Sequence, residues 1–124
     1  MSARVLVVDD EADFLATYER LLRREGYEVT AVSSCAAALA AVAREHPSLI
    51  ISDLRLGDGD GLDIVRAVRT TARPLPIIVV TGYASEELRR AALAAGATEF
   101  LAKPFLASAL LATVRAYLDQ SRAC

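Results

Sequence analysis

The chain has little of the side-chain chemistry on which most hydrolytic and metal enzymes depend. Its 124 residues include one histidine, two cysteines and no tryptophan. Cys35 and Cys124 lack metal-type spacing, and we expect both to be free thiols. His46 stands just before Pro47 at an expected helix end, which favours a role at that terminus over catalysis. Cysteine and histidine triads and zinc sites therefore lack the residues that would build them.

Long apolar runs and a strong net charge are missing too. No stretch approaches the ~18 consecutive apolar residues of a membrane span. The first ten residues, MSARVLVVDD, end in acid and do not resemble a signal peptide. The formal net charge of −2 gives no general attraction to nucleic acid or to anionic membranes. We expect a cytoplasmic protein that binds neither directly, and the length predicts one domain over residues 1–124.

Short apolar runs alternate with segments of helical periodicity along the whole chain. Each expected strand precedes a helical segment, and these strands are residues 5–8, 27–32, 49–51, 77–80 and 100–101. Ser33 or Ser34 and Ser85 predict helix starts, whereas Gly26 and Gly96 predict helix ends. Five βα units predict a doubly wound (βα)5 α/β fold of the flavodoxin-like type. Its five-stranded parallel sheet would have the order 2-1-3-4-5, with helices on both faces.

The informative polar residues follow the expected strands. Asp9 and Asp10 follow the first strand, Asp53 the third, Thr81 the fourth and Lys103 the fifth. The sheet order would bring them to one edge, where two carboxylates ~4 Å apart repel by about 4 kcal/mol at an effective dielectric of 20. Such a cluster needs a cation or a raised carboxyl pKa, and an oxygen-ligand set of this kind suits Mg²⁺. Lysine and threonine can hold phosphoryl oxygens, so the group predicts an aspartyl phosphate site.

Each of these residues also has a simpler structural interpretation. Asp10 or Asp13 could cap the first helix, Thr81 could stabilise a turn, and Lys103 could be a solvated lysine. Thirteen of the fourteen basic residues are arginine, however, and the single lysine falls at this sheet edge. Four separate coincidences at the ends of four strands favour a common site.

Glycine-rich and acidic segments offer three other binding motifs, and none fits. The segment GDGDG at residues 57–61 follows the third strand, and Leu62 stands where G-x-G-x-x-G needs its last glycine. The P-loop pattern is absent. Asp58, Asp60 and Asp63 suggest a calcium loop, but Leu62 occupies a ligand position and no glutamate closes the loop.

The blocks VLVVDDE, IISDLRL, VVTGYAS and GATEFLAKPF resemble, in order and spacing, those of receiver domains of bacterial two-component response regulators. The resemblance covers almost the whole chain. It implies that Asp53 accepts a phosphoryl group from a sensor histidine kinase or phosphotransfer protein. It also implies Mg²⁺, or Mn²⁺ in its place, on Asp9, Asp10 or both, on Asp53 and on the Arg55 backbone carbonyl.

The same resemblance implies a switch. Thr81 and Lys103 would grip the phosphoryl group, and the ring of Phe100 would respond to Thr81. The fourth helix, fifth strand and fifth helix would carry the signal to an output domain, to a downstream protein or to a phosphorylation-dependent homodimer. The Lys103–Pro104 bond is usually cis in the family, and Tyr83 and Arg55 could shield the phosphoryl group. Any output domain would be absent from this chain.

The sequence departs from the family pattern at three positions. Gly57 replaces a proline, Ser48 replaces an aspartate, and Phe100 lacks the hydroxyl of a tyrosine. The domain would not be an enzyme beyond self-catalysed phosphotransfer and slow autodephosphorylation. Two alternatives are a degenerate receiver that binds partners without phosphorylation and a haloacid dehalogenase-type phosphohydrolase. The second would want D-x-D on the first strand, which Asp10 breaks.

Overall fold

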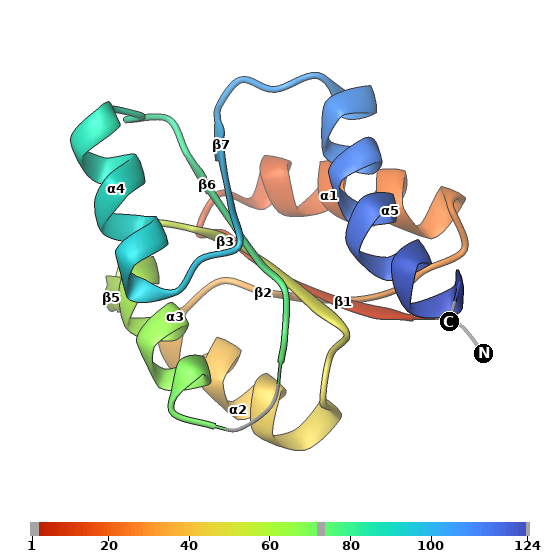
Figure 1. Cartoon of the computed structure of the whole chain (residues 1–124), viewed down its shortest axis with the longest axis horizontal. Coiled ribbons are helices and arrows are strands. Elements are labelled where there is room, and N and C mark those ends of the chain that lie inside the picture. Colours follow the sequence, from red (N-terminus) through yellow and green to blue (C-terminus); the bar gives the residue numbers. More distant parts are fainter. Residues whose placement is uncertain (1–2, 72–73, 124) are drawn as a thin grey trace.

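The computed structural model describes residues 3–71 and 74–123. Five strands form one parallel sheet in the order β2-β1-β3-β6-β7 (Figure 1). Counted along the chain as parallel strands, this is the predicted order 2-1-3-4-5. The strands are β1 (Arg4–Val8), β2 (Glu28–Val32), β3 (Leu49–Asp53), β6 (Ile77–Thr81) and β7 (Glu99–Ala102).

Helices cover both faces of this sheet, as predicted. They are α1 (Ala12–Arg24), α2 (Cys35–Glu45), α3 (Gly61–Arg69), α4 (Glu86–Ala95) and α5 (Ala107–Ala123). One apolar cluster joins the sheet to α1 and α5, and a second joins it to α2, α3 and α4 (Figure 1). Strands covered on both faces explain the continuous apolar runs in the sequence. Within the described residues, none of the helices combines the length and apolarity that a membrane crossing needs.

The helix ends follow the sequence signals, with one exception. Ser34 and Ser85 are the N-caps of α2 and α4, and Gly96 ends α4 in the left-handed region. His46 ends α2, also in a left-handed conformation with φ of 50°, so its predicted terminal position is confirmed. The N-cap of α1 is Glu11, and it makes no side-chain cap hydrogen bond. The capping role considered for Asp10 or Asp13 is therefore not observed.

A small hairpin follows β3 where the sequence analysis expected only a loop. Strand β4 (Arg55–Leu56) pairs antiparallel with β5 (Gly59–Asp60). Strands of two residues are too short to show apolar alternation, so no sequence pattern predicts them. Asp53, expected just beyond β3, is the last residue of that strand.

The three aspartates that suggested a calcium loop, Asp58, Asp60 and Asp63, form hydrogen bonds at the starts of helices instead. Asp60 and Asp63 form a capping box at the start of α3. Asp58 accepts hydrogen bonds from the backbone N–H groups of Cys35 and Ala36, at the start of α2.

Gly61 fixes where the hairpin returns to β3. Its backbone N–H donates to the carbonyl of Leu54 at 2.8 Å. A Cβ atom at this position would lie 2.2 Å from the carbonyl oxygen of Asp53. Only glycine allows the start of α3 to approach the end of β3 so closely.

The close approach predicts a large difference between two glycine substitutions. Gly61→Ala should lower the free energy of unfolding by about 2 kcal/mol, because the new methyl group meets backbone that cannot turn away. Gly57→Ala should change it by less than about 0.5 kcal/mol, since nothing lies within 4 Å of a Cβ there. Urea unfolding of both variants measures the difference, and equal stabilities would contradict the assigned packing.

Candidate functional site

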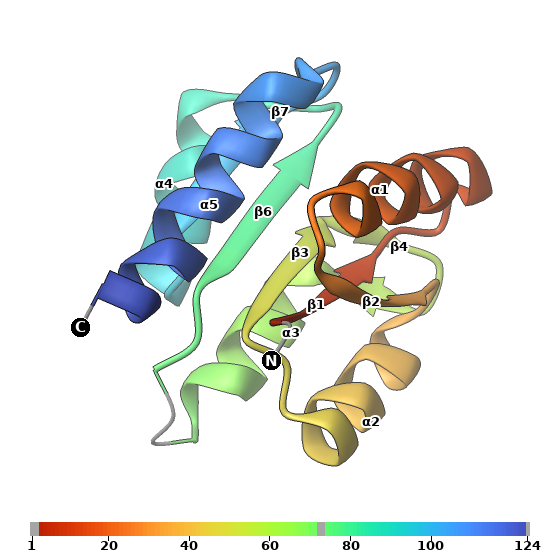
Figure 2. The ribbon, with the colours of Figure 1, turned by 90° about the vertical axis from the view of Figure 1, so that its right-hand side faces the viewer.

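Three ionic side chains from three strand ends meet at the carboxyl edge of the sheet. Asp9 follows β1, Asp53 ends β3 and Lys103 follows β7. Lys103 Nζ lies 2.8 Å from Asp9 Oδ2 and 2.9 Å from Asp53 Oδ2. Figure 2 shows β3 and β6 with their arrowheads toward this edge. Residues separated by up to 94 positions in the sequence therefore form one contact, as predicted from the topology.

Lys103 is held in place by more than the two carboxylates. Its side chain is 7% exposed, so the solvated lysine considered above is excluded. Its Nζ also lies 3.8 Å from the centroid of the Phe14 ring, and Glu11 Oε1 is 3.9 Å away. A cation over an aromatic face gains about 1–2 kcal/mol when it is partly desolvated. The ammonium group thus has two buried anions beside it and an aromatic ring against it.

Burial and ion pairing shift the pKa of Asp9 in opposite directions, and the same holds for Lys103. Burial raises the pKa of Asp9 above its ordinary value, and the hydrogen bonds from Lys103 and the Glu11 N–H only reduce that rise. Burial alone would lower the pKa of Lys103, but its hydrogen bonds to Asp9 and Asp53 outweigh this and raise it. The lysine is consequently a firmly charged group, whereas the Asp9 carboxylate is ionised at a desolvation penalty.

The Asp53 carboxylate has both oxygens engaged, and although it is largely buried it borders a pocket. Oδ2 accepts from Lys103, and Oδ1 accepts from the backbone N–H of Arg55 at 3.2 Å. Asp53 borders an open pocket of about 280 Å³. Its lining residues are Asp10, Glu11, Asp53, Arg55, Gly82, Tyr83 and Lys103.

Four carboxylates at this pocket can converge on one cation. One carboxylate oxygen from each of Asp9, Asp10, Glu11 and Asp53 lies within 4.8 Å of the other three. Asp9 is fully buried and Asp10 is exposed, so the group runs from the core to the pocket mouth. Hard oxygen donors with space for water on one side suit Mg²⁺. The residues therefore fit the predicted ion.

Thr81 and Phe100 belong to β6 and β7, and neither lines the pocket. Thr81 is buried, and its Oγ1 accepts from the backbone N–H of Tyr83 at 3.1 Å, which is the turn role considered for it. Phe100 pairs in register with Val79 of β6 and packs, partly buried, on the core side that holds α2, α3 and α4. Sheet neighbours thus link Phe100 to the strand that ends in Thr81. The Lys103–Pro104 bond is cis.

Arg55 and Tyr83 form a pair at the pocket mouth. The guanidinium carbon of Arg55 lies 3.8 Å from the centroid of the Tyr83 ring. Arg55 comes from β4 and Tyr83 from the turn after β6, and both side chains are exposed. Both residues were predicted to shield the phosphoryl group, but no sequence pattern predicts that they stack.

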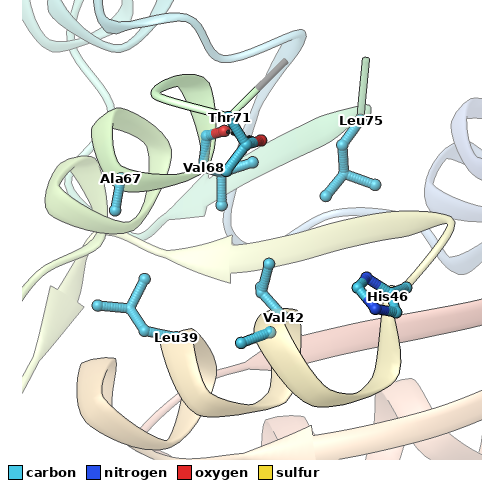
Figure 3. Close-up of a pocket in the computed structure, with 8 residues that line it drawn as sticks. Leu39, Val42, His46, Ala67, Val68, Thr71 and Leu75 are labelled. Carbon is cyan, nitrogen blue, oxygen red and sulfur yellow. Dashed lines mark hydrogen bonds between the residues drawn. The ribbon is translucent and has the colours of Figure 1, made fainter. Parts of the chain in front are cut away.

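A second pocket has a different character. It lies between α2 and α3 and has a volume of about 300 Å³ (Figure 3). Aliphatic side chains such as Leu39, Val42 and Leu75 line it, with His46 and Thr71 among its few polar groups. Among the described residues that line it there is no carboxylate, and His46 is their single basic residue, so the acidic pocket is the one suited to phosphoryl chemistry.

The fold and the site together define a class of protein. It is a doubly wound α/β domain with carboxylates and a lysine at the carboxyl edge of its sheet. Residues 5–115 match the family model of the response regulator receiver domain. The chain belongs to the response regulator receiver domain family. This confirms the resemblance found in the sequence, and receiver domains are regulatory modules rather than enzymes.

Similar proteins agree with this assignment. The chain is 40% identical over 117 residues to the transcriptional regulatory protein PrrA of Mycobacterium tuberculosis, a match that covers 94% of the chain and 50% of that protein. It is 38% identical to the response regulator MprA of Mycobacterium tuberculosis, covering 98% of the chain and 53% of that protein. The chain thus spans about half the length of these curated relatives.

Solved receiver structures superpose closely. A CheY-like response regulator receiver domain protein from Methanospirillum hungatei gives a TM-score of 0.93 at 31% identity, covering 99% of this chain and 98% of that one. The chemotaxis response regulator CheY4 of Vibrio cholerae gives 0.89 at 33% identity, covering 95% of this chain and 100% of that one.

Sequence reasoning missed two residues of the site. Glu11 follows Asp10 directly, so the acidic run DDE was the signal that could have found it. Phe14 lies one helical turn further along α1, where it could only be read as a core position. Its contact with Lys103 depends on tertiary packing. Of the two cysteines, Cys35 is a free thiol, and Cys124 lies outside the described residues.

The raised pKa of Asp9 predicts a pH-dependent effect of Asp9→Asn in metal-free buffer. Folded Asp9 keeps its proton to a higher pH than the unfolded chain, whose pKa is near 3.8, so the folded state binds more protons in that window. Wild-type stability should therefore fall relative to Asp9→Asn as the pH rises above about 4 and through the raised pKa of folded Asp9. Thermal unfolding with a chelator measures this, and a stability difference independent of pH would contradict it.

Proposed function

We propose that this domain is a phosphorylation-controlled switch in which Asp53 is the phosphoryl acceptor. The observation that supports it most directly is the Lys103 ammonium between Asp9 and Asp53, at 2.8 and 2.9 Å. Asp53 borders an open pocket, whereas Asp9 is fully buried. Asp53 is therefore the carboxylate that an incoming phosphoryl donor can reach.

The donor is a phosphohistidine of a sensor histidine kinase or phosphotransfer protein, or a small acyl phosphate. One Asp53 oxygen attacks phosphorus, and the bond from phosphorus to the donor breaks. Lys103 and the Arg55 N–H orient the Asp53 carboxylate for this attack and support the charge that develops on the phosphoryl oxygens. The chain's own contribution is mainly orientation and charge, as is usual in phosphoryl transfer.

The ion in this proposal is Mg²⁺, with Mn²⁺ able to substitute. Asp9, Asp10 and Asp53 would hold it through their carboxylates, and Glu11 is within reach of the same position. The Arg55 backbone carbonyl would be a further ligand. When bound, the ion neutralises carboxylate repulsion and withdraws charge from phosphoryl oxygens. The carboxylates alone would repel both one another and a phosphate group.

Phosphorylation then changes what Thr81 and Lys103 contact. Lys103 and the Thr81 hydroxyl turn to the new phosphoryl oxygens, and Thr81 gives up its turn contact with the Tyr83 N–H. Phe100 follows Thr81 and alters the surface made by α4, β7 and α5. Phe100 has no hydroxyl, so packing alone separates its two positions. Each tenfold shift between the two states corresponds to about 1.4 kcal/mol.

The partners of the proposed switch are a kinase or phosphotransfer protein and a receiver of the signal. The α4–β7–α5 surface would contact an output domain, a downstream protein or a second phosphorylated copy. A cytoplasmic location, the absence of direct nucleic-acid and membrane binding, and a single receiver domain over residues 1–124 remain predictions. The family match lends no support to a haloacid dehalogenase-type phosphohydrolase, and the acid, lysine and threonine set disfavours a degenerate receiver.

The first test of this proposal is labelling with acetyl phosphate and Mg²⁺. Wild type should gain one phosphoryl group and Asp53→Asn none, because the amide is not a nucleophile for phosphorus. Intact-protein mass spectrometry distinguishes the two. Equal labelling of both proteins would contradict the assignment of Asp53, and no labelling of wild type would favour a degenerate receiver.

The stacked side chains of Arg55 and Tyr83 predict a longer lifetime for the phosphoryl group on Asp53. Tyr83 and Arg55 border the pocket and restrict the approach of water to phosphorus. Tyr83→Ala should therefore shorten the half-life of phosphoryl-Asp53 by about threefold or more, on the order of 0.7 kcal/mol in the barrier. Loss of label after removal of acetyl phosphate gives the rate. An unchanged or longer half-life would count against shielding.

A further inference from the structure

The hairpin of β4 and β5 carries the backbone of Arg55 beside Asp53. Arg55 pairs with Asp60, and Leu56 pairs with Gly59. The base of the hairpin is fixed, because Gly61 bonds to the carbonyl of Leu54. The turn at its tip, Gly57 and Asp58, is exposed. Whatever holds this tip also limits how far the Arg55 backbone can move.

Asp58 ties the tip to a helix that lies more than twenty residues away in the sequence. Its Oδ1 accepts from the Cys35 N–H at 2.8 Å, and its Oδ2 accepts from the Ala36 N–H at 3.1 Å. These two N–H groups are the first of α2 and have no partner within the helix. The same bonds hold the pKa of Asp58 below its ordinary value. Both carboxylate oxygens are used, so the tie fixes an orientation as well as a distance.

This tie does more than cap α2, because the helix has its own N-cap. Ser34 Oγ accepts from the Ala37 N–H at 3.1 Å within the same element. Asp58 instead joins two elements, and removing it frees the hairpin tip as well as the helix end. Ser34 therefore offers a matched control in which the helix loses a cap and the hairpin keeps its anchor.

The hydrogen bonds of Asp58 matter for the hairpin because the neighbouring turn residue is Gly57. Proline at this position would restrict φ of the turn, whereas glycine leaves it free. Gly57 is not in the left-handed region, and nothing lies within 4 Å of a Cβ built there, so neither a positive φ nor a clash at Cβ argues against a proline at this position. Two other contacts hold the hairpin, the buried Leu56 side chain and the Cys35 thiol, which donates to the carbonyl of Asp60 at 3.6 Å.

We propose that Asp58 is a positioning residue for the phosphorylation site. By anchoring the β4–β5 hairpin to the start of α2, it holds the Arg55 backbone beside Asp53 and replaces the rigidity that Gly57 lacks. The inference rests on the proposed function in one respect, since the Arg55 carbonyl is there a ligand of Mg²⁺. The anchor itself is independent of any ion.

Three variants of the unphosphorylated protein test this role: Asp58→Ala, Ser34→Ala and the double variant Gly57→Pro with Asp58→Ala. Amide hydrogen exchange at Arg55 reports how firmly its backbone N–H is held against Asp53 Oδ1. Titration with Mg²⁺, followed by NMR, reports the affinity of the site for the ion. Asp58→Ala should speed Arg55 exchange and weaken Mg²⁺ binding by several-fold, up to about tenfold. Ser34→Ala should leave both within about twofold of wild type. The double variant should regain most of the Mg²⁺ affinity.

The outcomes separate this inference from the function on which it rests. Unchanged Arg55 exchange in Asp58→Ala overturns the anchor, and so do equal losses of Mg²⁺ affinity in Asp58→Ala and Ser34→Ala. A failure of proline to rescue the double variant overturns the claim that Asp58 substitutes for turn rigidity. If wild type itself binds no Mg²⁺, the proposed function fails, while faster Arg55 exchange in Asp58→Ala alone still supports the anchor.

Discussion

The contact of Lys103 with Asp9 and Asp53 is the interaction on which the rest of the site depends. Two carboxylates at the ends of adjacent strands would repel each other in a buried position, and the ammonium group at 2.8 and 2.9 Å makes the arrangement stable. Parallel strands in the order β2-β1-β3-β6-β7 bring these three side chains to one edge. The fold thus brings the two carboxylates close together, and the positive charge of Lys103 offsets their repulsion.

That contact also explains how a local charge change can reach a distant surface. A phosphoryl group on Asp53 would compete with Asp9 for the same ammonium group, and Lys103 is attached directly to β7. Thr81 at the end of β6 and Phe100 on β7 lie on neighbouring, hydrogen-bonded strands. In the proposed switch, the redistribution of one cation and one hydroxyl therefore acts on the two strands that support the output surface.

Patterns local to one element allowed much of this structure to be predicted. Apolar runs such as Val5–Val8 identified strands, and acids directly after them located the sheet edge. The β4–β5 hairpin, the Phe14 ring against Lys103 and the Asp58 bonds to α2 were not predicted. The last two join residues far apart in sequence, and their existence depends on packing distances that no local pattern encodes. The hairpin strands are too short to show a period.

In the proposed switch, phosphorylation of Asp53 redirects Lys103 and Thr81 and so changes the α4–β7–α5 surface. The most direct measurement is the amide NMR spectrum of the protein with Mg²⁺, before and after addition of beryllofluoride as a stable phosphoryl mimic. We expect amide shifts at Thr81 and Lys103 that continue into β7 and the facing residues of α4 and α5. Shifts confined to the immediate neighbours of Asp53, with α4, β7 and α5 unchanged, would contradict it.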